Sequence, residues 1–357
     1  NTKADAEQFN IVTCYQQFLK DDPDVSMPIA AIESLVELIK HSKANTLSEF
    51  MESLKEANQK LKNSVRNSIS LSAGADLFLR FVTRTSHDVT NFEAYKEHLI
   101  NSGKELVEKA AAVREKIAEL GVQFIKDDAA PAAQKKRFKV YVTESRPTYL
   151  GQVLLLFLEI SRSSWLTDFT LFRIRATKLL LKAGVPATVI YDAAVGYIID
   201  KVDAVFVGAE GVVENGGLIN AVSHHSVYLR DASRTALKSS SMFQIGTYQL
   251  AVVAKAANKP FYAVIESYKF VRLFPLNQYD LPTHTPDLLA FPDLEHHSQA
   301  DELKQKVVNE EDVDIGDYEA INPTVDYTPP DYITLLCTDL GVLTPSGVSD
   351  ELIKLYL

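Results

Sequence analysis

One stretch of the chain, VDAVFVGAEGVVENGGLIN (Val202–Asn220), constrains the fold more than any other. A short apolar run, Ala204–Val207, ends at Gly208 and a polar loop is expected to follow, and four of the chain's 14 glycines fall between Gly208 and Gly217. Glycine tolerates positive φ angles and lets another backbone or a ligand approach closely. A buried strand that opens into such a loop is how a parallel α/β sheet forms a ligand crevice at the carboxyl ends of its strands. The stretch therefore predicts a ligand-type α/β sheet, with Glu210 and Asn215 as the side chains in the loop that carry chemistry.

From Arg137 onward, predicted strands alternate with predicted helices. Strands are expected at Phe138–Val142, at Thr188–Tyr191 and in the later run PFYAVIES, and the run TYQLAVVAKAANK just before it is helical. The run YITLLCTD could be either. Alternation of this kind means parallel strand pairing in a doubly wound sheet. The predicted class is therefore α/β, with an N-terminal helical domain over residues 1–127 followed by a Rossmann-like, mostly parallel α/β domain over residues 128–357.

The first 125 residues or so are predicted to be mostly helical. Pro28 suits a first helical turn, and apolar residues recur after it at helical spacing. The polar faces mix Glu and Lys, so each face is either the solvated surface of a helical bundle or a docking surface for another protein. Further helices are expected at Leu47–Leu61, Gly74–Thr83, Asn91–Ser102 and Lys104–Ile125.

Three segments of the predicted α/β domain look like insertions. They lie near residues 154–172, 221–243 and 287–319. The last of them is acidic and dense in charge, which is typical of a surface loop.

The composition argues against several classes of function. With 37 basic and 47 acidic side chains the net charge is −10, which disfavours binding of the whole chain to nucleic acid or an anionic membrane. Two cysteines, Cys14 and Cys337, are too few for a disulfide framework and fit a reducing compartment. Both are expected to be packed thiols rather than reactive thiolates. No apolar run approaches the length of a membrane span.

The common motifs for nucleotide, metal and nucleophilic chemistry are missing from the sequence. There is no P-loop, no G-x-G-x-x-G and no G-x-S-x-G. The pairs His224–His225 and His296–His297 have no Cys or carboxylate beside them at ligand spacing, and neighbours in sequence point apart on a regular element. We therefore expect no metal site and no catalytic nucleophile.

Polar side chains gather instead at the ends of the predicted strands. Arg146 and Lys269 could hold a phosphate, because a guanidinium fork and an ammonium both suit that group. The carboxylates could move protons, as a sugar isomerisation needs. An internal salt-bridge network that ties the loops together explains the same residues equally well. The set comprises Glu144, Arg146, Asp192, Glu210, Asn215, Glu266 and Lys269.

Several long motifs, in order along the chain, resemble a known family. They are DAAVGYI, GAEGVVENGG, IGTYQLAVVAKAANKPFYAV, ESYKFVRLFPLNQ and VDYTPPDYITLLCTDLGVLTPSGVSDELIKLYL. Together they resemble the alpha-subunit family of eukaryotic translation initiation factor 2B, and the likeness covers most of the chain apart from the insertions. The pattern is similar, more distantly, to the methylthioribose-1-phosphate and ribose-1,5-bisphosphate isomerases.

The isomerase resemblance assigns roles to the residues of the glycine loop. The enzymes' catalytic Asp corresponds to Glu210, and the longer side chain displaces the carboxylate by roughly 1 Å, which proton transfer does not tolerate well. The Lys of the enzymes' N-K-I-G-T motif is missing from this chain, which reads Gln-Ile-Gly-Thr at Gln244–Thr247. Their E-T-R-P appears as Glu144–Pro147. In the enzymes, a strand–loop element that carries a cysteine lies just before this motif. In this chain the element should lie at Asp127–Gln134, where it is largely absent. We infer that residues are missing from the sequence at this join. The resemblance thus implies ligand binding without catalysis, by Glu144, Arg146, Glu210, Asn215, Gly216, Asn220, Thr247 and Lys269.

The resemblance to the initiation-factor subunits implies a non-catalytic regulatory subunit of the guanine-nucleotide exchange factor for translation initiation factor 2. It implies a cytoplasmic homodimer, formed through the α/β domains, that bridges the beta, gamma, delta and epsilon subunits into a decamer. The helical domain would help to sense the phosphorylated alpha subunit of initiation factor 2. No metal, nucleic acid or membrane is expected as a partner, and the small molecule expected is a phosphorylated sugar or nucleotide. A sugar-phosphate isomerase and a stand-alone metabolite-binding protein are the alternatives.

The last residues of the chain, ELIKLYL (351–357), are mainly apolar. Apolar side chains at the end of a chain are better buried than exposed. We therefore expect them to pack in the dimer interface or against the α/β core.

Overall fold

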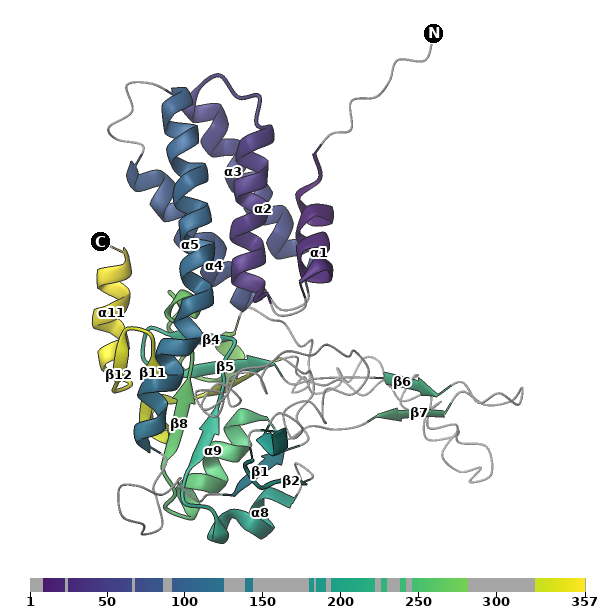
Figure 1. Cartoon of the computed structure of the whole chain (residues 1–357), viewed down its shortest axis with the longest axis vertical. Helices are drawn as coiled ribbons and strands as arrows, with labels where there is room; N and C mark the ends of the chain where they lie inside the picture. The colour runs from purple at the N-terminus through teal and green to yellow at the C-terminus, as the bar shows by residue number, and fades with distance from the viewer. Residues whose placement is uncertain are drawn as a thin grey trace, which may run out of the picture.

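The computed structural model describes the chain in two parts, a helical part above a sheet-containing part (Figure 1). The described residues are 9–22, 25–65, 68–85, 92–124, 139–143, 180–182, 184–190, 194–221, 226–229, 238–241, 246–281 and 325–356. The helical part consists of residues 9–124 and the α/β part begins at residue 139, so the predicted boundary at residue 127 lies outside the described residues.

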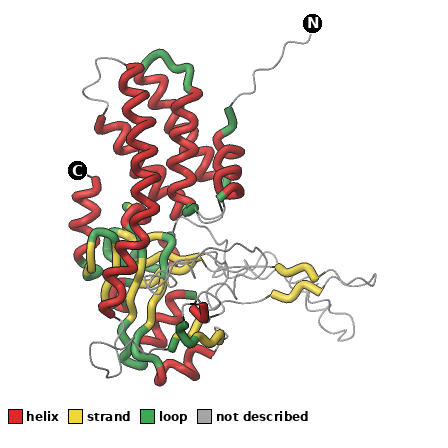
Figure 2. Tube along the Cα trace, in the orientation of Figure 1, coloured by secondary structure: helices red, strands yellow, loops and turns green. Residues whose placement is uncertain are grey.

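Five helices form the helical part and stand side by side as a bundle (Figure 2). The Asn10 side chain accepts hydrogen bonds from the first turn of α1, and Thr46 does the same for α3. Such caps satisfy backbone N–H groups that have no partner within the helix. Pro28 lies in the first turn of α2, as the sequence predicts. The helices are α1 (Ile11–Asp21), α2 (Met27–His41), α3 (Leu47–Asn63), α4 (Ile69–Thr85) and α5 (Phe92–Gly121), followed by the short turn η2 (Val122–Phe124).

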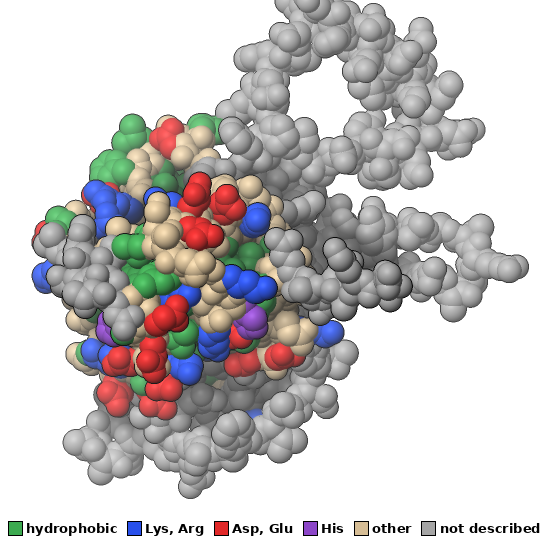
Figure 3. Space-filling view, turned by 90° about the horizontal axis from the view of Figure 1, so that it is seen from above, with side chains coloured by type: hydrophobic (Ala, Val, Ile, Leu, Met, Phe, Trp, Pro, Cys, Tyr) green, Lys and Arg blue, Asp and Glu red, His purple; other side chains and the backbone are tan. Residues whose placement is uncertain are grey.

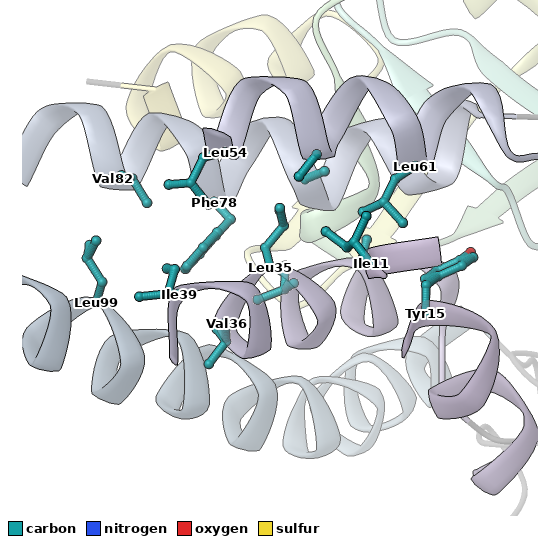
Figure 4. Close-up of a cluster of buried hydrophobic side chains, with 14 of the residues drawn as sticks. Ile11, Tyr15, Leu35, Val36, Ile39, Leu54, Leu61, Phe78, Val82 and Leu99 are labelled. Atoms are coloured by element: carbon teal, nitrogen blue, oxygen red, sulfur yellow. The ribbon is translucent and has the colours of Figure 1, made fainter. Parts of the chain in front are cut away.

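The core of the bundle surrounds α2, which lies between the other helices. Leu35, Ile39, Leu54, Phe78 and Leu99 come from α2, α3, α4 and α5 and point toward one another (Figure 4), and all five are almost fully buried. Burying a Leu, Ile or Phe side chain stabilises the folded state by about 1.5–3 kcal/mol relative to exposure. Buried side chains from four helices therefore stabilise this part together.

The two helices expected at Asn91–Ser102 and Lys104–Ile125 are a single helix, α5, and this prediction was wrong. Gly103, which separates the two expected ranges, is buried inside α5 and faces Val36 of α2. A Cβ at residue 103 would collide with the Val36 side chain. The glycine allows close packing of two helices and does not mark a helix end.

A mainly parallel sheet forms the centre of the α/β part. Its strand order is β12-β11-β8-β3, with β3, β8 and β11 parallel and β12 antiparallel at the edge. Helix α9 (Thr247–Ala256) precedes β8 and packs on the sheet through Ala251 and Ala254. The α/β class is confirmed, and the run YITLLCTD contains a strand rather than a helix. The strands are β3 (Val205–Val207), β8 (Phe261–Val264), β11 (Leu335–Thr338) and β12 (Gly341–Leu343), and a separate parallel pair is formed by β1 (Val140–Thr143) and β2 (Ala187–Ile190).

The glycine-rich stretch does not form the open loop that its composition suggested. It forms a hairpin of two short strands, β4 and β5, within a second sheet of order β10-β5-β4-β9. Val212, Val213, Leu218 and Ile219 are fully buried in this hairpin. Their burial is the physical reason for the correction, because a stretch with so many buried apolar residues cannot stay an irregular loop. The strands are β4 (Gly211–Val213), β5 (Leu218–Ala221), β9 (Phe270–Val271) and β10 (Val325–Thr328).

Two strands, β6 (Ser226–Leu229) and β7 (Lys238–Ser241), pair as a hairpin inside the segment predicted as an insertion near 221–243 (Figure 1). The other two predicted insertions, near 154–172 and 287–319, lie outside the described residues. The remaining short elements are α8 (Val195–Ile198), η4 (Ile199–Lys201), η5 (Ser267–Lys269), η6 (Gln278–Asp280), η9 (Pro330–Tyr332) and α11 (Gly347–Tyr356).

The helical part contacts both sheets. Ile69 of α4 is buried against Val213 and Val271 of the second sheet. Ile117 of α5 is buried against Val264 and Cys337 of the main sheet. The two parts therefore share apolar contacts at their junction.

The C-terminal helix α11 packs on the α/β core. Leu352 is buried there, as predicted for the apolar C-terminal residues, and Leu355 packs beside it. Ile353 faces outward with 52% of its surface exposed.

Viewed from above, the surface carries acidic and basic side chains side by side (Figure 3). Among the described helices, none is both long and apolar enough to cross a bilayer. The described residues also contain no group of three or more His, Cys, Asp or Glu side chains placed to hold a metal ion.

Candidate functional site

Three polar side chains lie in a row across the second sheet: Glu210, Asn220 and Asp326. Asn220 on β5 is paired directly with Asp326 on β10. The backbone N–H of Glu210, just before β4, donates to the Asn220 side-chain oxygen at 3.1 Å. Each of the three residues is less than a tenth exposed. Buried polar groups need partners, so such a row is either a satisfied internal network or a binding site.

The amino end of α9 meets this row. The Asn220 amide donates to the Thr247 hydroxyl at 2.8 Å and to the carbonyl oxygen of Gly208 at 2.7 Å. Thr247 is the first residue of α9, and Gly246 precedes it as the N-cap. The structure therefore brings together Glu210, Asn220 and Thr247, three of the residues predicted to bind a ligand.

Asp326 belongs to this site, although the sequence analysis included it only as one residue of the long motif that begins VDYTPPDYITLL. Its Oδ2 atom accepts a hydrogen bond from the backbone N–H of Tyr248, in the first turn of α9, at 2.8 Å. A carboxylate here also interacts favourably with the positive end of the helix dipole. A Cβ at Gly246 would collide with the same carboxylate, so a larger residue at that N-cap would require the Asp326 side chain to shift.

Burial raises the pKa of Asp326 to about 6, although hydrogen bonds from backbone N–H groups act in the opposite direction. Its Oδ1 atom has no hydrogen-bond partner within the part of the chain that the structure describes. A carboxyl group with a pKa near neutrality and an unused oxygen can accept or donate a hydrogen bond to a ligand hydroxyl. The row thus has capacity for a small polar ligand beyond its internal bonds.

Replacing Asp326 with Asn should change how stability depends on pH. The pKa of Asp326 in the folded protein lies above its ordinary value of 3.8, so its contribution to stability is fully present below about pH 4 and is lost as pH rises through 6. The Asp326→Asn variant lacks this loss while keeping an acceptor for Tyr248. Relative to the wild type, it should gain up to about 3 kcal/mol in free energy of unfolding between pH 4 and pH 7. Urea denaturation at both pH values measures this, and a difference that does not vary with pH would contradict it.

Lys269 is held in an ion pair rather than pointing freely into a binding site. Its Nζ atom lies 2.8 Å from Glu266 Oε2, and Glu266 also accepts a hydrogen bond from Arg114 Nε on α5 at 3.3 Å. Burial alone would raise the pKa of Glu266, but the charges of Lys269 and Arg114 outweigh burial and lower it to about 2. Lys269 also approaches the carbonyl oxygen of Ala209 at 3.5 Å. The sequence left two roles open for Lys269, binding a phosphate or forming an internal salt bridge, and the structure contains the salt bridge.

Asn215 and Gly216 lie at the other end of the hairpin, in the turn between β4 and β5. The Asn215 amide donates to the Tyr327 hydroxyl at 2.7 Å and to the carbonyl oxygen of Pro275 at 3.1 Å. Gly216 has a φ of +85°, and a Cβ there would collide with the carbonyl of Pro345. These two predicted ligand residues are occupied in holding the turn and are not brought together with Glu210.

Several sequence predictions fall on residues outside the described part of the chain. They are Glu144, Arg146 and Asp192 of the polar set and the join at Asp127–Gln134.

The chain is similar in sequence to one family of known proteins and to several of its members. The model of the initiation factor 2 subunit family matches residues 20–130, 175–229 and 233–345. The translation initiation factor eIF2B subunit alpha of Dictyostelium discoideum is 38% identical over 364 residues, covering 97% of this chain and 96% of the relative. The ribose 1,5-bisphosphate isomerase of Archaeoglobus fulgidus is 27% identical, covering 86% of this chain and 82% of the enzyme.

A solved structure agrees in fold. A chain of the tetrameric eIF2B-beta2-delta2 complex from C. thermophilum superposes with a TM-score of 0.59 at 15% sequence identity, covering 96% of this chain and 92% of that one. At this identity the likeness shows the fold alone. The family-model match and the full-length match to an alpha subunit show the family, and they confirm the resemblance seen in the sequence motifs. The chain belongs to the initiation factor 2 subunit family.

Proposed function

We propose that this chain is a non-catalytic regulatory subunit of the guanine-nucleotide exchange factor for translation initiation factor 2, acting in the cytoplasm. The observation that carries the proposal is the match to an alpha subunit of initiation factor 2B at 38% identity over nearly the whole of both chains. A related fold solved within a complex of beta and delta subunits supports assembly with such partners. Its partners would be the beta, gamma, delta and epsilon subunits.

The alternative is a sugar-phosphate isomerase, which the relatives named as ribose 1,5-bisphosphate isomerases keep open. Asp326, whose pKa of about 6 suits proton transfer, favours it. Glu210 in place of the enzymes' Asp argues against it. An isomerase assay with ribose 1,5-bisphosphate and methylthioribose 1-phosphate separates the two. Turnover that is abolished in Glu210→Gln would overturn the regulatory proposal, and its absence in the wild type would support it.

The proposed homodimer would form through the α/β part, where one short stretch of sequence exposes three large apolar side chains. Phe274, Leu276 and Tyr279 are 62%, 77% and 74% exposed. The turn that carries them is held rigidly, because Asp280 Oδ2 accepts hydrogen bonds from the backbone of Leu276 and Asn277 at 2.8 and 3.2 Å. Apolar side chains held outward by a fixed turn are typical of a protein contact. We propose that a second copy of the chain covers them.

Introducing a charge at this turn tests the dimer. We expect Leu276→Asp to weaken dimerisation by roughly 100-fold, because an unpaired carboxylate would be buried in the contact. The control is Tyr197→Asp, since Tyr197 is 82% exposed on α8 and lies outside the turn. Light scattering across a concentration series measures the dissociation constant. Equal dissociation constants for the two variants would contradict the proposal, as would a wild type that stays monomeric.

We propose that the helical part helps to sense the phosphorylated alpha subunit of initiation factor 2. The end of the molecule seen from above carries Lys and Arg side chains that could pair with a phosphate (Figure 3). Nucleotide exchange should be inhibited by phosphorylated initiation factor 2 when the assembly contains this chain. Exchange by an assembly that lacks it should resist the inhibition, and equal inhibition in both would refute the sensing role.

A further inference from the structure

An ion triad around one buried carboxylate joins the helical part to the α/β part. Glu266 follows β8 and is 1% exposed, and its two oxygens contact Arg114 at 3.3 Å and Lys269 at 2.8 Å. Arg114 lies on α5, whereas Lys269 ends the short turn η5. Each oxygen of Glu266 therefore binds one cation, Oε1 that of the helical part and Oε2 that of the α/β part.

The segment that carries the triad is fixed on both of its flanks. The backbone N–H and the hydroxyl of Ser267 each donate to Asp339 at 2.7 Å. Tyr268 accepts a hydrogen bond from Ser26 at 3.4 Å and packs against the core of the helical bundle. The backbone around Glu266 thus has little freedom, and a change in charge must be taken up by the side chains of Arg114 and Lys269.

Lys269 is the member of the triad that also reaches the candidate site. The pairing of β4 with β9 places Val212 beside Phe270, so the glycine-rich hairpin and Lys269 are neighbours. The Nζ atom is 3.5 Å from the carbonyl oxygen of Ala209, the residue before Glu210. An ammonium group has three donors, and this contact is long, so Lys269 retains capacity for an added anion.

We propose that Arg114 is a positioning residue that sets how strongly Lys269 binds an anion at the candidate site. Arg114 neutralises part of the Glu266 charge, which leaves Lys269 less tightly held and more available to a phosphate group. An anion that draws Lys269 away leaves Glu266 more dependent on Arg114, and this strengthens the contact between α5 and the α/β part. Linkage makes the two effects equal in size. The inference rests on the expectation, implied by the isomerase resemblance, that this site of the proposed regulatory subunit binds a phosphorylated small molecule.

The test compares three variants of the full chain with the wild type. Arg114→Gln removes the charge, Arg114→Lys retains it, and Lys116→Gln removes the same charge from an exposed position on the same helix. Ribose 1,5-bisphosphate is the probe, with unphosphorylated ribose for comparison, and isothermal titration calorimetry measures the dissociation constant. We expect Arg114→Gln to weaken bisphosphate binding about tenfold, within the usual range for coupling between sites. Arg114→Lys should restore most of the affinity, and Lys116→Gln should leave it unchanged.

The reciprocal effect gives a second measurement. Saturating bisphosphate should slow hydrogen exchange at the end of α5 around Ile117 in the wild type and not in Arg114→Gln. Bisphosphate binding that is equal in the wild type and Arg114→Gln overturns the inference while leaving the ligand site intact. If Arg114→Lys loses as much bisphosphate affinity as Arg114→Gln, the inference is also overturned, because the positive charge at residue 114 would then not be the cause of the affinity. If the wild type binds neither bisphosphate nor ribose, the ligand site fails and the inference fails with it.

Discussion

Replacing Gly74 with Leu is expected to lower the free energy of unfolding by at least about 3 kcal/mol. Gly74 lies on α4 where it crosses the start of α2, and a Cβ there would be 2.5 Å from the carbonyl oxygen of Pro28 and 2.7 Å from its Cα. These are backbone atoms, so the contact can be relieved only by moving one helix away from the other. Leu forms helices better than Gly, so any loss must come from packing and not from helix propensity.

The matched control is Gly196→Leu on α8, where no atom lies within 4 Å of an added Cβ. We expect it to stay within about 0.5 kcal/mol of the wild type. Urea denaturation followed by circular dichroism at the helical minimum compares the two variants. A Gly74→Leu variant as stable as Gly196→Leu would show that α2 and α4 do not approach as closely as the structure has them.

Glu266→Gln is expected to cost about 3–5 kcal/mol at neutral pH, because it leaves the charges of Arg114 and Lys269 without their shared carboxylate. The pKa of Glu266 is lowered from 4.5 to about 2, so its contribution is fully present above about pH 4.5 and is lost as pH falls toward 2. The difference between wild type and variant should therefore be constant from pH 7 to 5 and should shrink below that. Chemical denaturation over this pH range gives the measurement.

An exposed ion pair provides the control for Glu266→Gln. Glu105 and Lys109 lie 2.7 Å apart on the outer face of α5, where solvent screens their charges. Glu105→Gln should leave the midpoint of unfolding unchanged at every pH. If Glu266→Gln behaved in the same way, the buried triad would contribute nothing to the junction.

Helical periodicity was enough to predict the bundle, because the apolar stripe of α2 is what the other helices bury. Gly103 misled the prediction for α5, since sequence alone does not distinguish a glycine that ends a helix from one that allows close packing. The hairpin around Asn215–Gly216 could have been predicted. Asn-Gly between two apolar pairs is a strong signal for a tight turn between antiparallel strands, and the ligand-loop interpretation overlooked it.

The candidate site was only partly predictable. The resemblance implied that Glu210, Asn220 and Thr247 belong to one site. The structure places them together, because the Asn220 side chain binds the backbone N–H of Glu210 and the Thr247 hydroxyl. Arg114 was not foreseen, since it lies 152 residues before Glu266 and has no motif around it. Asp326 had a signal in its motif, but its importance depends on burial against α9, which only the folded structure gives.

Helix α5 has 30 residues, so it is about 45 Å long at 1.5 Å per residue. Its C-terminal end contacts the sheet through Ile117, and its N-terminal end lies at the far end of the bundle (Figure 1). A tilt of about 5° at the sheet end would move the far end by roughly 4 Å, given this length. A small tilt of α5 at the junction would therefore cause its largest displacement at the end of the bundle farthest from the sheets. Distance labels placed at that end would measure it most easily.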